Sequence, residues 1–161
     1  MHPHAALIRA FYDSLARRDA AGMAACYHPD VVFSDPAFKN LQGDRARAMW
    51  AMLCARGHDL AIRYTDVQAD DRHGSAHWEA TYTFSQSGRL VHNSIDASFD
   101  FKDGMIIRHT DTFNLWRWAS MALGPKGRFL GWLPPIQAAI SKNAMSGLDA
   151  YIQKQAAAAK A

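Results

Sequence analysis

The first third of the chain has the hydrophobic spacing of helices. Apolar residues recur at intervals of three and four over residues 5–18, which predicts an amphipathic helix. A second, short helix is expected over residues 20–27 and a third over residues 44–57. Between the second and third helices, residues 31–35 are expected to form a strand. This strand is short because Pro36 ends it.

Further along, the pattern changes to the alternation that is typical of strands. Runs over residues 60–69, 75–85 and 90–101 are separated by short turn sequences. A strong hairpin signal, Asp103-Gly104, leads into a last strand over residues 105–113. Helices followed by a long antiparallel meander predict an α+β fold.

The last predicted strand mixes polar and apolar residues on one face. Side chains alternate across a strand, so His109 and Asp111 share a face with Met105, Ile107 and Phe113. Burying an unpaired polar group costs roughly 2–7 kcal/mol. Therefore His109 and Asp111 either bond to neighbours and hold the sheet together, or line a cavity. The sequence leaves both readings open.

The segment 115–161 differs from the rest in composition. It is rich in aromatic residues, and after Pro134-Pro135 a helix is expected with an apolar residue at every fourth position. It also holds six of the 18 Lys and Arg residues but only one acid, Asp149, so the net charge of +3 originates here. We expect this extension to cover the domain or a partner subunit. Docking on a membrane surface is the alternative, and nucleic acid is not an expected partner.

Composition narrows the class of protein. The 49% hydrophobic and 20% charged residues are typical of a soluble globular protein. No apolar run approaches the roughly 20 residues of a membrane span, and the N-terminus lacks the apolar core of a signal peptide. Cys26 and Cys54 have no metal-binding spacing, which favours buried free thiols and a cytoplasmic location.

The order of elements resembles the nuclear transport factor 2-like superfamily, in particular its SnoaL-like and ketosteroid-isomerase-like branch. The marks of this resemblance are FYDSLARRD, YHPDVVFSDP and the hairpins that end in DGMIIRHTDTF. It implies a domain over residues 1–114, built as a cone-shaped, curved antiparallel sheet with three N-terminal helices packed on its concave face. Residues 115–161 would form a helical C-terminal extension. A conical cavity and a homodimer are also implied, and the polar outer face of the sheet is expected to be an interface or to face solvent.

The resemblance carries over one catalytic position and lacks two others. In ketosteroid isomerases a carboxylate before a proline, at the end of the short strand, shuttles the proton, and Asp35 matches it. The oxyanion-binding tyrosine falls on Phe11, with Tyr12 one position away, and the oxyanion-binding aspartate falls on Ala97. Both oxyanion donors are therefore missing at the matched positions. The resemblance also places the row of His109 in the cavity wall.

These residues suggest a set of catalytic roles. Asp35 is expected to be the base, His109 the donor to a developing enolate oxygen, and Asp111 the residue that orients the imidazole. A metal is not expected, because a third ligand and its supporting groups are not evident. The expected substrate-binding residues are Phe11, Tyr12, Phe33, Trp50, Trp78, Tyr82, Phe99 and Phe113.

Three functions follow from this reading. The leading one is an isomerase, dehydratase or cyclase that needs no cofactor and acts on a small hydrophobic carbonyl compound. The second is a non-catalytic protein that holds a hydrophobic ligand in the same cavity. The third is an interaction module whose basic tail docks on a membrane or a partner. No phosphate-binding loop, nucleophilic serine motif or Cys–His signature points elsewhere.

Overall fold

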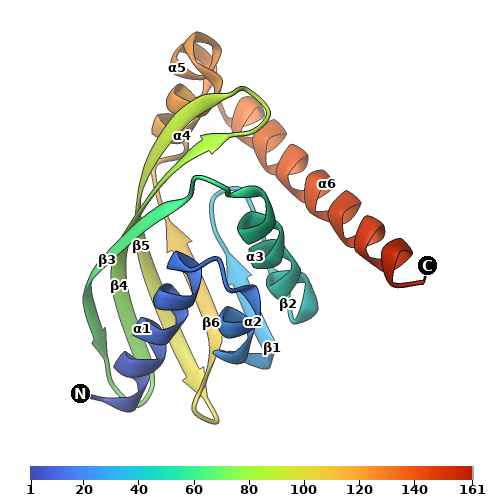
Figure 1. Cartoon of the computed structure of the whole chain (residues 1–161). Helices are drawn as coiled ribbons and strands as arrows, with labels where there is room; N and C mark the ends of the chain where they lie inside the picture. The colour runs from blue at the N-terminus through green and yellow to red at the C-terminus, as the bar shows by residue number, and fades with distance from the viewer. Residues whose placement is uncertain (161) are drawn as a thin grey trace.

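A computed structural model describes residues 1–160 and shows an α+β fold (Figure 1). The elements in chain order are α1 (Pro3–Ala16), α2 (Ala20–Ala25), β1 (Tyr27–Ser34), β2 (Leu41–Gln42), α3 (Asp44–Arg56), β3 (Ala61–Ala69), β4 (His73–Phe84), β5 (Arg89–Lys102), β6 (Met105–Thr112), α4 (Leu115–Leu123), α5 (Pro125–Leu130) and α6 (Pro134–Ala159).

The strands form one curved sheet in the order β2-β1-β6-β5-β4-β3. Neighbouring strands are antiparallel except β1 and β6, which run parallel. The predicted fold class, a curved sheet with three N-terminal helices on its concave face, is confirmed (Figure 1). The apolar stripe of α1 fills the space between helix and sheet, since Ile8, Phe11, Tyr12 and Leu15 are fully buried.

The start of β1 differs from the sequence prediction. The strand begins at Tyr27 rather than at residue 31, and so includes Pro29. The pairing of β1 with β6 shifts register between Tyr27 and Val32. Pro29 has no backbone N–H to donate to a neighbouring strand. It is tolerated because it lies within this register shift, where β1 and β6 are not regularly hydrogen-bonded.

The C-terminal extension consists of three helices, of which the sequence pattern predicted only the last. The aromatic stretch forms α4 and α5, and Asn114 caps α4 by accepting a hydrogen bond from the N–H of Arg117 at 3.0 Å. Helix α6 then runs past α3 (Figure 1). It is fixed there by the fully buried Leu148 and by an ion pair of 2.7 Å between Arg45 and Asp149.

Two further expectations can be compared with the described residues. Cys26 and Cys54 are buried and free. Within residues 1–160, no helix combines the length and apolar character that crossing a membrane requires.

Candidate functional site

A cavity of about 410 Å³ lies between the concave face of the sheet, α3 and the C-terminal extension. Each of these three parts contributes apolar side chains to its wall, so the cavity has the character of a site for a small, largely hydrophobic molecule. Examples are Met49, Trp50, Trp78, Ile95, Trp118 and Ile140.

Two carboxylates, Asp35 and Asp111, also line this cavity. Asp35 follows the end of β1, and its Oδ1 accepts hydrogen bonds from the backbone N–H groups of Ala37 at 2.7 Å and Phe38 at 2.6 Å. Its second oxygen, Oδ2, has no hydrogen-bond partner among residues 1–160. One carboxylate oxygen therefore holds the loop, and the other is available to a ligand.

The surroundings of Asp35 make it a weak acid. Desolvation by burial raises its pKa from 3.8 to about 7. The hydrogen bond from the Phe38 N–H acts in the opposite direction, while the negative charge of Asp111 adds to the increase. Near neutral pH Asp35 thus exchanges between its protonated and ionised forms, as a general acid or base must.

Asp111 is held by a chain of buried hydrogen bonds. Its Oδ1 lies 2.9 Å from Nε2 of His109, and Nδ1 of His109 lies 2.8 Å from the hydroxyl of Tyr27. The indole N–H of Trp50 donates to that same hydroxyl at 2.8 Å. Every group is satisfied if Tyr27 donates its own proton to Nδ1 and the neutral His109 donates from Nε2 to Asp111.

His109 itself lies behind the cavity wall, which corrects the prediction that it contacts the ligand. It is fully buried, and Phe11, Phe33 and Phe99 surround it with ring centroids 4.4–5.3 Å away. Because Phe11 belongs to α1, His109 lies at the level of the sheet that α1 covers. Asp111 was expected to orient the imidazole of His109. In the structure the hydrogen bond between them instead positions the carboxylate of Asp111, because only Asp111 reaches the cavity.

The predicted substrate-binding residues divide into two groups. Trp50, Trp78, Tyr82 and Phe113 line the cavity together with Asp35 and Asp111. The other predicted positions are fully or almost fully buried in the core and are not part of the cavity wall, so the structure does not support direct contact with a ligand. These are Phe11, Tyr12, Phe33 and Phe99.

Two neutral hydrogen-bond donors face the same cavity. The hydroxyl of Tyr82 accepts a hydrogen bond from the indole N–H of Trp118 at 2.8 Å, which leaves its own proton available. Burial raises the pKa of Tyr82, so it stays protonated. Asn93 is buried on β5, and its amide has no side-chain hydrogen bond within residues 1–160.

Three residues of this region were not predicted from the sequence: Tyr27, Asn93 and Trp118. A signal for Asn93 was present, because it interrupts the apolar row of Val91, Ile95 and Ala97 on β5. Tyr27 carried no such signal, since its partner His109 is 82 positions away.

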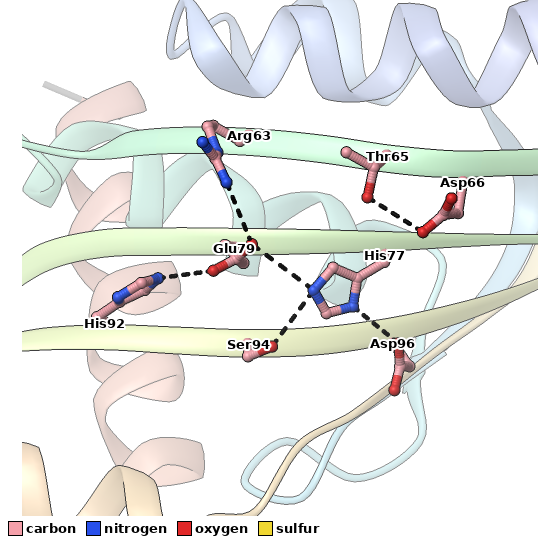
Figure 2. A network of polar contacts seen from close by, with 8 residues as sticks. All are labelled: Arg63, Thr65, Asp66, His77, Glu79, His92, Ser94 and Asp96. Atoms are coloured by element: carbon pink, nitrogen blue, oxygen red, sulfur yellow. Dashed lines mark hydrogen bonds and ion pairs between the residues drawn. The ribbon is translucent and has the colours of Figure 1, made fainter.

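The outer face of the sheet carries a separate polar network (Figure 2). Glu79 lies 2.9 Å from His92 and 3.6 Å from Arg63, and His77 lies 2.9 Å from Asp96. The hydrogen bond from His92 lowers the pKa of Glu79. These side chains alternate with the cavity-facing residues of the same strands, so they do not reach the cavity. Among residues 1–160 no group of three or more His, Cys, Asp or Glu side chains is arranged to hold a metal ion.

Solved structures with the same fold span most of this chain. A protein from Xanthomonas campestris pv. campestris, described as a polyketide cyclase, is 26% identical with a TM-score of 0.58, covering 72% of this chain and 93% of its own. An LEH-like epoxide hydrolase from M. tuberculosis is 17% identical with a TM-score of 0.62, covering 82% and 96%. A protein from Catenulispora acidiphila with a ketosteroid isomerase-like fold is 11% identical with a TM-score of 0.65, covering 74% and 93%.

The comparison with proteins of curated function found no match. The sequence profile of the SnoaL-like domain, however, matches residues 8–109, which is most of the region where the resemblance was seen. Together with the ketosteroid isomerase-like fold, this match confirms the predicted superfamily and branch. The chain therefore belongs to the SnoaL-like domain family.

Proposed function

We propose that this protein is an enzyme that performs general acid–base chemistry on a small hydrophobic carbonyl compound, as an isomerase, dehydratase or cyclase. The observation that carries the proposal is Asp35. It lies on the wall of an apolar cavity with one oxygen fixed by two backbone N–H groups and the other free. A carboxylate held in this way can remove a proton from the carbon next to a carbonyl group.

Tyr82 and Asn93 supply the donors that the matched family positions lack. When Asp35 takes the proton, negative charge develops on the carbonyl oxygen of the substrate, and a donor placed there lowers the barrier. The free hydroxyl proton of Tyr82 suits this role, and the charge of Asp35 is close enough to raise the pKa of Tyr82. Asn93 faces the same cavity with an amide that is free to donate.

Asp111 is the second polar anchor of the proposed site. The chain from Trp50 through Tyr27 and His109 fixes the position of its carboxylate at the cavity wall. In this proposal Asp111 contacts the substrate, while His109 and Tyr27 are positioning residues. The descriptions of two similar structures as a polyketide cyclase and an epoxide hydrolase support an enzymatic role.

The test is exchange of carbon-bound protons with solvent. The protein is incubated in D₂O with a panel of enolisable aryl ketones and cyclic diketones, and deuterium incorporation is followed by NMR. The proposal predicts catalysed exchange for at least one compound, with a loss of at least about tenfold in Asp35→Asn. Tyr82→Phe, which removes the proposed donor, is expected to lose about tenfold or more as well. Wild-type exchange rates in Asp35→Asn would contradict the assignment.

A non-catalytic ligand-binding role is the second candidate, favoured by the largely apolar wall of the cavity. Native mass spectrometry of the purified protein, followed by organic extraction, separates the two functions. A retained compound that shows no catalysed proton exchange and no conversion would support the binding role over the enzymatic one.

A further inference from the structure

Helices α4 and α5 of the C-terminal extension lie at one end of the molecule (Figure 1). These helices and the turn after α5 carry a group of large, exposed apolar side chains. Trp116 is 45% exposed, Phe129 69%, Leu130 40% and Trp132 55%. We call these four residues the aromatic tip. Exposed apolar side chains gathered on one surface mark an interaction site, whereas single ones do not.

Hydrogen bonds from two indole side chains to the backbone hold Trp116 and Trp132 beside the end of α5, where Phe129 and Leu130 lie. The indole N–H of Trp116 donates to the carbonyl of Arg128 at 2.9 Å, and that of Trp132 donates to the carbonyl of Phe129 at 3.1 Å. The single polar atom of each indole is therefore satisfied within the protein. What the two rings present to the outside is hydrocarbon.

The charged side chains on the helices that carry the aromatic tip are all of one sign. Arg117, Lys126 and Arg128 are exposed on α4 and α5, and no acidic residue occurs between positions 112 and 148. A two-fold contact between two copies of the tip would bring the same basic groups together, which is unfavourable. An anionic surface would instead neutralise them.

We propose that the aromatic tip docks on the surface of an anionic phospholipid membrane. Aromatic side chains are favoured at the boundary between headgroups and acyl chains, and nearby Arg and Lys side chains bind anionic headgroups.

The position of the cavity gives this docking a consequence. Trp118 and Lys126 of α4 and α5, and Ile136 of α6, line the cavity, so the helices that carry the tip also form its wall. A docked molecule would place this wall beside the lipid phase, where hydrophobic compounds concentrate. The transfer of a ligand from lipid rests on the proposed function of the cavity, whereas the docking does not.

The experiment is co-sedimentation of the full chain with vesicles of phosphatidylcholine alone and of phosphatidylcholine with phosphatidylglycerol. We expect binding to the anionic vesicles, weak or no binding to the neutral ones, and release at roughly 1 M salt, where charges are screened beyond about 3 Å. Phe129→Ser with Trp132→Ser, and separately Arg117→Glu with Arg128→Glu, should each weaken binding at least about tenfold.

The matched control is Leu90→Ser. Leu90 is 65% exposed, but it shares the outer sheet face with His92 and lies outside the tip, so its loss should leave vesicle binding unchanged. Circular dichroism and the melting temperature check that each variant is folded. A second measurement needs no variants. If the tip docks on the membrane, brominated lipid in anionic vesicles should quench the tryptophan fluorescence of the wild-type protein.

Three outcomes would overturn the proposal. The first is absence of binding, or of quenching, with anionic vesicles. The second is equal binding to neutral and anionic vesicles. The third is a wild-type dimer that becomes monomeric in the Phe129→Ser, Trp132→Ser variant, which would show that a second copy covers the tip. None of these outcomes depends on whether Asp35 catalyses proton exchange, so the two proposals can fail separately.

Discussion

Asp35 combines two roles in the structure. It is a turn residue, because its Oδ1 accepts two backbone hydrogen bonds, and it also lines the cavity. Its sequence context predicted the position but not the raised pKa. That pKa depends on apolar surroundings contributed by distant parts of the chain, and on the charge of Asp111.

The raised pKa of Asp35 makes stability depend on pH. Between about pH 4 and about pH 7 the folded protein binds more protons than the unfolded chain, so stability falls as pH rises. Asp35→Asn keeps an oxygen for the two backbone N–H groups and removes this dependence. Its stability relative to wild type should rise across that window by about 1–2 kcal/mol. The whole increase in the pKa of Asp35 corresponds to a stability change of roughly 4 kcal/mol. The expected change is smaller because the carboxyl group is partly in contact with solvent.

Urea unfolding of the wild type and of Asp35→Asn at several pH values between 4 and 8 measures this difference. A constant difference across the range would show that Asp35 titrates with its ordinary pKa.

Tyr27 holds the buried chain of hydrogen bonds together. Tyr27→Phe leaves the N–H of Trp50 without its acceptor and Nδ1 of His109 without its partner. Because both groups are buried, we expect a loss of about 1–3 kcal/mol in the free energy of unfolding. The control is Tyr64→Phe, which removes an exposed hydrogen bond of 2.7 Å to Asp13 and should cost less than about 1 kcal/mol. Equal losses in the two variants would argue against the buried chain.

At the scale of elements, alternation along a strand predicts which face a residue occupies but not how deep it lies. His109 and Asp111 share a face as predicted, yet only Asp111 reaches the cavity. The difference arises because Phe11 of α1 packs over His109. The packing of a helix on a sheet is set by contacts far apart in sequence, and a pattern within one strand does not contain them.

The close packing of α5 on α4 depends on Gly127, which lies within α5 and faces Ala119 of α4. A Cβ atom at this position would clash with the backbone carbonyl oxygen of Ala119, which cannot move aside as a side chain can. Gly127→Ala should therefore separate the two helices and lower the free energy of unfolding by about 1–3 kcal/mol.

Gly147→Ala in α6 is the matched control, because a Cβ there meets no atom within 4 Å. Alanine favours a helix over glycine, so this variant should gain about 0.5–1 kcal/mol. Thermal unfolding of both variants is the measurement. A stable Gly127→Ala protein would show that α5 does not pack closely on α4.

At the scale of the whole molecule, the sequence predicted the fold class and the superfamily, while the shape of the C-terminal extension required the structure. The apolar row of α6 predicted a buried helix, and Leu148 is fully buried. The aromatic stretch before it has no simple period, because α4 and α5 are short and meet through glycine. Within this stretch Trp118 donates a hydrogen bond to Tyr82 of the sheet, whereas Trp116 and Trp132 are exposed.

The homodimer stays a prediction, and the outer face of β3, β4 and β5 is where we expect it. Light scattering should give about twice the chain mass of 17.9 kDa. Glu79 pairs with Arg63 and His92 on that face (Figure 2). Glu79→Arg would remove both pairs and place a second positive charge beside Arg63, so it should disrupt a contact made by this face and produce monomers. A monomeric wild type, or a dimer unaffected by Glu79→Arg, would place the contact elsewhere or remove it.

If Asp35 is the cavity base and has a raised pKa, its ionisation should govern the rate of catalysed proton exchange. We would measure this rate in D₂O between about pH 5 and pH 9. We expect the rate to rise with a single ionisation near 7, the pKa of Asp35. Asp35→Asn should abolish this dependence and lower the rate at least about tenfold. A rate that is flat across this range, or one that rises near 7 equally in Asp35→Asn, would contradict this expectation.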